Sequence, residues 1–216
     1  MIRALILLFI CWAMPAAADP ALKSIVLVAS GKLGDPNFDR SVVLVTRHGA
    51  GGPIGVILNR PTETAVAKVF PDADALPAGA DRIFFGGPVA SRMIVFLFRA
   101  PTPPANSLQV LPGLYLSFDA ELLNDLIRAK GPKSDLRIFT GYAGWAPDQL
   151  ENEIARGDWH PIPADADLVF RSDTEKLWLD LIRRASARSV GTDAPWRAAV
   201  SPAPALRTVA ASAGGD

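Results

Sequence analysis

Residues 41–61 have the sequence SVVLVTRHGAGGPIGVILNRP, in which a glycine-rich segment separates two apolar runs. The runs at 41–47 and 54–59 are rich in valine and isoleucine, which is typical of buried strands. A glycine-rich connection between two such runs predicts a hairpin. We expect Pro61 to end the second strand, because proline has no backbone N–H to donate to a strand ladder.

The same glycines raise a second hypothesis, a phosphate-binding loop. A dinucleotide loop needs G-x-G-x-x-G between a strand and a helix, but here Ile54 stands where the third glycine is required. The lysine of a Walker loop is also absent, and a strand follows the glycines instead of a helix. We therefore expect the segment to turn the chain, with an anion held by its backbone amides as the lesser alternative.

Apolar runs elsewhere in the chain predict strands and helices that do not strictly alternate. This order favours the α+β class over a doubly wound parallel sheet. The run at 93–99 is too apolar for an edge strand, and 119–130 has the spacing of an amphipathic helix capped by Ser117 or Asp119. The other predicted strands are 24–29, 82–85, 113–117, 135–140, 159–163 and 168–170, and the other predicted helices are 65–70, 149–156 and 174–184.

Length and charge restrict the classes of function. The chain has 216 residues, half of them hydrophobic, which is enough for one domain with a substantial core. Its 22 basic and 22 acidic residues balance, so direct nucleic-acid binding is unlikely. The two histidines, His48 and His160, have no metal-ligand spacing around them, and we predict neither a metal site nor a cofactor.

Both ends of the chain differ from its body. Residues 1–18 combine a basic start, an apolar run and small residues before Ala18-Asp19, which predicts a cleaved signal peptide and a periplasmic or secreted protein. The alternatives are an uncleaved anchor or a misplaced start codon with a cytoplasmic protein. Cleavage would remove Cys11 and leave no membrane span in the mature chain. Residues 185–216 have the composition of a disordered tail, in which Trp196 is a possible docking residue, so the expected domain is 19–184.

Four blocks of sequence, in the right order, resemble the YqgE/AlgH family, also called UPF0301 or DUF179. The resemblance implies a compact α+β domain with a bent, bifurcated, mostly antiparallel β-sheet and packed helices. It implies no established reaction, although one branch is named for a proposed role in regulating alginate production. The matching residues are Asp35, Pro36, Phe38, Arg40–Val43, His48, Gly55, Asn59–Pro61, then Gly86–Val89, then Gly141–Trp145 with Gln149–Glu151 and Trp159, and finally Phe170 and Leu177-Trp178.

This chain departs from the family pattern in three places. Most members begin without a signal peptide, and this chain has one by its sequence pattern. Ala29-Ser30-Gly31 replaces the usual small-Met-Pro sequence after the first strand, and the tail after about residue 185 is additional. These departures concern the cellular setting more than the fold.

Polar residues of the family blocks are the candidate site. Asp35 and Asp39 could pair with Arg40 and pin a loop, or Arg40 and Arg60 could hold an anionic ligand in a polar pocket. His48 could act as a general base, or simply end the hairpin with a backbone partner. The candidate ligand-binding residues are Asp35, Arg40, His48, Asn59, Arg60, Gly86 and Gly87, with no catalytic residue assigned.

Other polar and aromatic residues are expected to be structural. Gly86-Gly87 would allow a tight backbone crossing, and Asn59 would satisfy amides of a turn. Trp145, Trp159 and Trp178 are expected in the core. Gln149, Glu151 and Glu153 are expected on the solvated face of their helix.

These observations favour a non-catalytic binding or regulatory domain in the periplasm. Its partner would be a protein, a peptide or a small anionic ligand. One alternative is a small hydrolase or transferase with a polar pocket near His48. Another is a cytoplasmic regulator linked to transcription.

Overall fold

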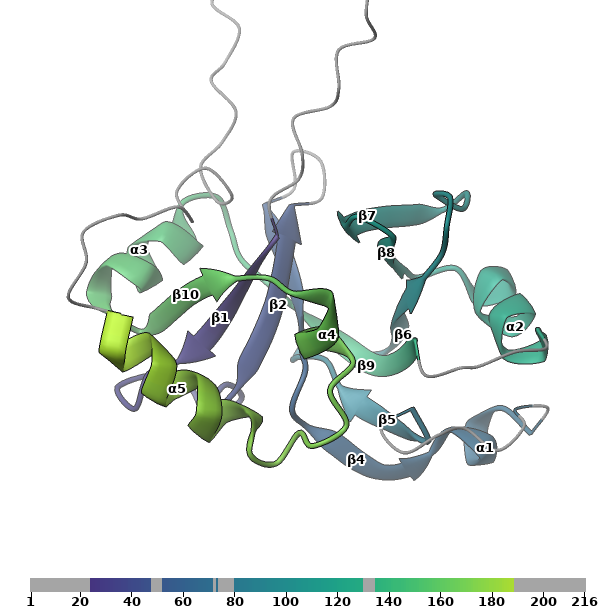
Figure 1. The fold of residues 1–216 in the computed structure, drawn as a ribbon, viewed down its shortest axis with the longest axis horizontal. Coiled ribbons are helices and arrows are strands. Elements are labelled where there is room, and N and C mark those ends of the chain that lie inside the picture. Colours follow the sequence, from purple (N-terminus) through teal and green to yellow (C-terminus); the bar gives the residue numbers. More distant parts are fainter. Residues whose placement is uncertain (1–23, 48–51, 72, 74–79, 130–134, 189–216) are drawn as a thin grey trace, which may run out of the picture.

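The structure, a computed structural model, describes residues 24–47, 52–71, 73, 80–129 and 135–188. In these residues ten strands form a curled sheet whose main path runs β10-β1-β2-β3-β9-β6-β8-β7. A side branch pairs β4 with β5 and β5 with β9, and this β5–β9 pair is the parallel one among otherwise antiparallel pairs. Five helices pack around the sheet (Figure 1). The α+β class and the bent, branched, mostly antiparallel sheet are confirmed.

The elements follow one another in a mixed order along the chain. The strands are β1 Ile25–Ala29, β2 Val42–Arg47, β3 Pro53–Ile57, β4 Pro61–Ala65, β5 Arg82–Phe85, β6 Val89–Arg99, β7 Ser107–Leu111, β8 Leu114–Ser117, β9 Leu136–Gly144 and β10 Trp159–Pro163. The helices are α1 Val66–Val69, α2 Ala120–Arg128, α3 Gln149–Arg156, α4 Ala166–Val169 and α5 Leu177–Arg188. No helix among the described residues is long and apolar enough to cross a membrane.

The predicted hairpin at 41–61 is confirmed. β2 and β3 pair antiparallel, from Val43 opposite Ile57 to Arg47 opposite Pro53. The second strand ends earlier than expected, at Ile57, and a turn follows at Leu58 and Asn59. Pro61 therefore does not end it but begins β4, an exposed strand at which a missing N–H is tolerated.

Helices occupy opposite ends of the molecule. α5 packs against β1 and β10, and α3 packs against β10, at the left of Figure 1. α1 and α2 lie at the right of the same view, α1 beside β4 and β5. We call the first the α5 end and the second the α2 end. Three clusters of buried apolar side chains fill the layers, one between the sheet and α4–α5, one beneath α3, and one beneath α1 and α2.

Several predicted elements need correction. Residues 168–170 belong to helix α4 and its end, not to a strand, because Asp165 caps the helix by accepting from the Asp167 N–H. β4 and β7 were not predicted, β6 begins earlier than expected, at Val89, and β9 continues to Gly144 through sequence that looked like a loop. The last helix begins at Leu177 and runs to Arg188. As expected for α2, Asp119 is the cap that accepts from Glu121 and Leu122.

One charged side chain lies unexpectedly inside the core. Arg137 is 1% exposed and points between the sheet and the C-terminal segment. Its guanidinium donates to the Arg171 carbonyl over 2.8 Å and lies 4.6 Å above the ring of Phe84. Burial lowers the pKa of Arg137 to about 10. This side chain ties the segment before α5 to β9.

Candidate functional site

The loop at 30–41, here called the signature loop, is held by two side chains from the turn between β3 and β4. The Asn59 Oδ1 atom accepts from the Val42 N–H over 2.8 Å, and its Nδ2 donates to the Arg40 carbonyl over 2.9 Å. Arg60 donates to the carbonyls of Asp39, at 2.7 Å, and of Asn37, with a longer contact to Pro36 at 3.4 Å. Asn59 therefore has the structural role predicted for it, although it binds the Val42 N–H and the Arg40 carbonyl instead of several turn amides, and Arg60 clamps the loop backbone.

Arg40 and Asp35 do not pair with each other. Arg40 has a left-handed backbone with φ of 50°, and its guanidinium lies 5.8 Å from the Trp178 ring on α5. Asp35 accepts instead from the Asn37 N–H within the loop, over 2.8 Å. The hypothesis that Asp35 or Asp39 pins the loop by pairing with Arg40 is wrong, because Arg60 supplies the donors that hold it.

The two glycines of the candidate set serve close backbone contact. A Cβ on Gly86 would lie 2.2 Å from the Gly141 carbonyl oxygen, and one on Gly87 would lie 2.4 Å from the Tyr142 backbone. The Gly86 carbonyl also accepts from the Ile57 N–H over 2.9 Å. The predicted tight crossing is confirmed, with β9 as the crossed strand.

The candidate residues are thus brought together only in part. Asp35, Arg40, Asn59 and Arg60 meet around the signature loop, and the Arg60 carbonyl accepts from the Phe85 N–H just before the glycines. His48 lies outside the described residues. Among the residues that are described, no group of three His, Cys, Asp or Glu side chains could hold a metal ion.

Two tryptophans and one glutamate of α3 form a network against which Phe38 of the signature loop packs. The Glu153 Oε2 atom accepts from the indole N–H of Trp145 over 2.8 Å and from that of Trp159 over 2.9 Å. Gln149 donates to the other carboxylate oxygen over 2.8 Å. The Phe38 ring of the loop contacts both indoles, with centroids 6.3 and 5.6 Å away.

This network corrects the expectation of a solvated face on α3. Glu153 binds the buried indoles of Trp145 and Trp159, and Glu151 forms an ion pair with Arg47 over 3.5 Å, whereas Gln149 itself is exposed as expected. Trp145 and Trp159 are core residues as predicted, at 6% and 2% exposure. The signal was present in the family block, because a helix carrying Gln149 and Glu153 at i and i+4 lies between the two tryptophans.

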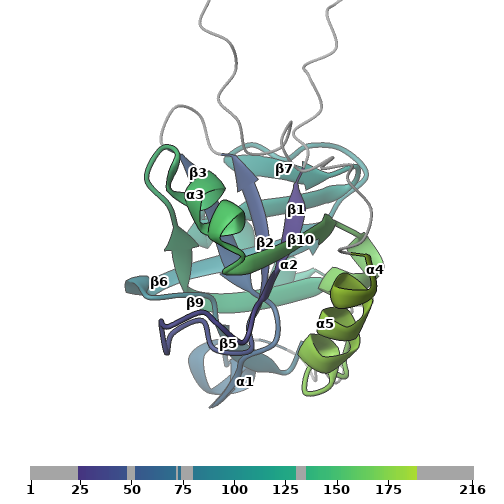
Figure 2. The same cartoon turned by 90° about the vertical axis from the view of Figure 1, so that its left-hand side faces the viewer.

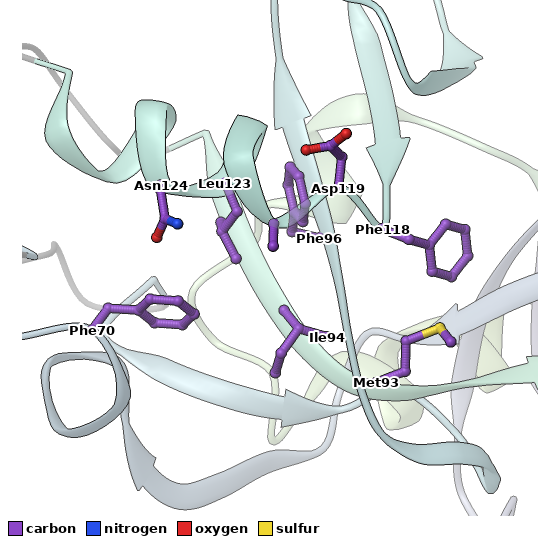
Figure 3. Close-up of a pocket in the computed structure, with 9 residues that line it drawn as sticks. Phe70, Met93, Ile94, Phe96, Phe118, Asp119, Leu123 and Asn124 are labelled. Atoms are coloured by element: carbon purple, nitrogen blue, oxygen red, sulfur yellow. The ribbon is translucent and has the colours of Figure 1, made fainter.

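An open cavity lies at the α2 end, away from the signature loop. A cavity of about 270 Å³ opens there between α2, β6 and the end of α1. Figure 3 shows Met93 and Phe118 on one side of it and Phe70 and Asn124 on the other. We call this cavity the apolar groove. It is lined by Phe70, Met93, Ile94, Phe96, Phe118, Asp119, Ala120, Leu123 and Asn124.

The apolar groove has a buried floor and an exposed rim. Phe96 and Leu123 are 1% and 2% exposed, whereas Met93 and Phe118 are 45% and 38% exposed. Asp119 is the acidic residue of the lining, and its hydrogen bonds from Leu122 and Asn106 lower the pKa of its carboxyl, which stays ionised at neutral pH. Sequence reasoning did not find this site, because its residues come from separate strands and helices and share no motif.

The fold and the clamped loop define a class of protein, a single α+β domain built on a curled and branched antiparallel sheet. The solution structure of AlgH from Pseudomonas aeruginosa is similar to it, with a TM-score of 0.61 and 28% identity over 88% of this chain and 98% of that one. A crystal structure of a Corynebacterium diphtheriae protein is also similar, with a TM-score of 0.60 and 25% identity over 85% and 94% of the two chains.

The profile of the AlgH-like family, DUF179, matches residues 26–189, and the chain belongs to this family. A UPF0301 protein of Anaeromyxobacter dehalogenans strain 2CP-C is 40% identical over 188 residues, which cover 82% of this chain and 95% of that protein. A UPF0301 protein of Myxococcus xanthus is 37% identical over 161 residues, 73% and 87% of the two chains. The resemblance seen in the sequence blocks is confirmed.

Proposed function

We propose that this AlgH-like protein is a non-catalytic binding domain that takes its ligand in the apolar groove. The observation that carries the proposal is the exposure of Met93 and Phe118 around a cavity of about 270 Å³. Exposed apolar side chains around a concave floor gain free energy when a ligand removes them from water, roughly 25 cal/mol for each Å² covered.

The signature loop is the weaker candidate for ligand binding. Asn59 and Arg60, in the turn between β3 and β4, use their donors and acceptors on the backbone of the signature loop and the start of β2, so a ligand there would have to displace existing hydrogen bonds. Arg40 faces Trp178. A polar pocket for an anion is therefore not the arrangement that these contacts support.

Export to the periplasm is the second part of the proposal, and it rests on the pattern of residues 1–18. The N-terminal mass of the native protein, taken from separated periplasmic and cytoplasmic fractions, tests it. A periplasmic chain beginning at Asp19 is the expected result. A cytoplasmic chain that keeps residues before Asp19 would overturn export.

The test of the binding site uses the neutral apolar dye Nile red and the full chain. Met93→Asp places a charge at the rim of the apolar groove, and Leu179→Asp is its matched control, because Leu179 on α5 is also 45% exposed. We expect Nile red to bind the wild type and Leu179→Asp equally, and Met93→Asp at least roughly tenfold more weakly. Equal binding by all three chains would place the dye elsewhere and remove the groove as the site.

The enzyme hypothesis has its own test. A hydrolase near His48 predicts turnover of ester or phosphate substrates that His48→Ala abolishes while the melting temperature hardly changes. Such turnover would overturn the non-catalytic part of the proposal.

A further inference from the structure

The first half of β6 has an unpaired edge next to the apolar groove. On one side β6 pairs with β9, from Val89 opposite Tyr142 to Phe98 opposite Leu136. On the other side it pairs with β8 only from Phe96 to Arg99. The chain leaves the sheet after Ser117 and enters α2, so residues 89–95 extend past the last described strand on that side.

This part of β6 is accessible to a partner. Residues 89–93 are all exposed. In Figure 2 the labelled part of β6 projects from the body at the left of the view. A register shift between Val89 and Ile94 and a left-handed Ala90, with φ of 46°, bend the strand there. A bend of this kind limits pairing to a short segment.

The backbone direction at Ile94 follows from the bonds farther along the strand. The Arg99 N–H donates to the Asp135 carbonyl on the β9 side, whereas the Ala100 N–H donates to the Gly113 carbonyl on the β8 side. Backbone groups alternate between the two edges of an antiparallel strand. Counting back by twos from Ala100 along the regular pairing, the N–H and C=O of Ile94 face the edge that β8 no longer covers.

Two residues of the unpaired edge of β6, Met93 and Ile94, also line the apolar groove. Phe118 closes it where the chain leaves β8. A strand laid along this edge would send alternate side chains to the face that carries the groove. Main-chain pairing and a pocket for alternate side chains are the two parts of peptide recognition by strand addition.

The carboxylates at the start of α2 favour a basic residue near them in the occupant. The Asp119 carboxylate lies at the rim, and Glu121 follows it in the first turn of α2. Within the described part of the chain, neither carboxylate forms an ion pair with a lysine or arginine. A cation in the bound segment would therefore meet unpaired negative charge.

We propose that an extended segment of a partner protein adds to the free edge of β6 as a strand, places an apolar side chain in the apolar groove and a basic side chain near Asp119. This inference rests on the proposed function and names the class of ligand. The pairing centres on Ile94, and the segment is short because the bend at Ala90 and the entry into α2 limit it on either side.

The experiment begins with random dodecapeptides displayed on phage and selected against the full chain. The selected peptides are expected to alternate apolar and polar residues and to include a lysine or arginine. Each is then made in two forms that carry backbone N-methyl groups on alternate residues, one set on odd positions and the other on even positions. Strand addition predicts that one form binds roughly tenfold more weakly, because it loses the main-chain donors that face β6, while the other retains its affinity.

Two further measurements keep the outcomes distinct. Bound peptide should slow hydrogen exchange of the Ile94 amide, and Met93→Asp should weaken the peptide while Leu179→Asp should not. If peptides bind but both N-methyl forms bind equally and the Ile94 amide stays unprotected, strand addition is wrong. If no peptide is selected although Nile red still binds at the groove, the peptide inference fails and the binding function stands. If neither binds there, both proposals fail.

Discussion

The signature loop and the apolar groove use their side chains in opposite ways. At the signature loop, the side chains of Asn59 and Arg60 form hydrogen bonds with backbone groups of residues 36–42. The segment richest in family residues therefore uses these polar atoms to hold its own fold. In the groove, Met93 and Phe118 remain exposed above buried Phe96 and Leu123. The motif rich in glycine, asparagine and arginine thus stabilises the fold. The proposed binding surface lies instead beside β6, where the pairing with β8 ends.

The largest effect is expected from Gly86→Ala at the crossing beside the loop. The new methyl group would meet the Gly141 carbonyl oxygen at 2.2 Å, and neither backbone can move freely inside the sheet. We expect a loss of roughly 3 kcal/mol or more in the free energy of unfolding, measured by urea denaturation. Gly34→Ala is the control, because a Cβ there meets nothing within 4 Å. Similar stability of the two variants would show that the backbone at Gly86 can move away from β9 at little cost, and that the region beside the loop is not rigidly held.

The next effect concerns Glu153 beneath the loop. Glu153→Ala would leave the indole N–H groups of Trp145 and Trp159 without their acceptor, and both rings are buried. Each orphaned donor costs about 1–2 kcal/mol, because the two hydrogen bonds are only partly buried, so we expect a loss of about 2–4 kcal/mol in urea denaturation.

Glu153→Gln is the conservative variant, since its amide oxygen can still accept from the indoles. It should restore most of the stability and the tryptophan fluorescence of the wild type. If Glu153→Ala were as stable as Glu153→Gln, the carboxylate would not support the loop. The claim that polar side chains around the signature loop serve the fold would then be wrong for Glu153.

A smaller effect separates clamping from ligand binding at Arg60. Arg60→Ala removes the donors to the Asp39 and Asn37 carbonyls, which lie near the surface, so we expect a loss of about 1 kcal/mol and faster amide exchange at residues 36–42. Arg82→Ala, which removes an exposed arginine paired with Glu63, is the control. Nile red and peptide binding should not change in either variant. A loss of binding in Arg60→Ala alone would move the ligand site to the loop.

The fold was largely predictable because its strongest signals are local. The β2–β3 hairpin, α2 and α3 each carry their pattern within a short run of sequence, and their periods and caps were sufficient to locate them. β7 and α4 were missed because Ser107–Leu111 follows a proline-rich loop and Ala166–Val169 is a single turn. Their conformation depends on pairing with β8 and on the Asp165 cap.

The site was predictable only where its residues are consecutive. The blocks containing Asn59-Arg60 and Gly86-Gly87 could be found in the sequence, but their polar atoms could not be assigned to the loop backbone without the fold. The apolar groove gave no signal, because an apolar residue in a strand such as Met93 is expected to be buried. Its exposure depends on how the other elements are arranged around β6, which the strand pattern does not contain.

The smallest effect is a pH dependence at the α5 end, far from the groove. His160 on β10 lies opposite Val28, and partial burial, together with the charge of Lys32 in the signature loop, lowers its pKa below 6.5. The unfolded chain therefore takes up the proton at higher pH than the folded chain, so the contribution of His160 to stability is present above about 6.5 and is lost as the pH falls below it. His160→Gln should flatten this part of the stability profile in urea denaturation between neutral and mildly acidic pH, and Lys32→Gln should reduce it. An unchanged slope in His160→Gln would assign the acid sensitivity to carboxylates, and peptide binding at β6 should be indifferent to both substitutions.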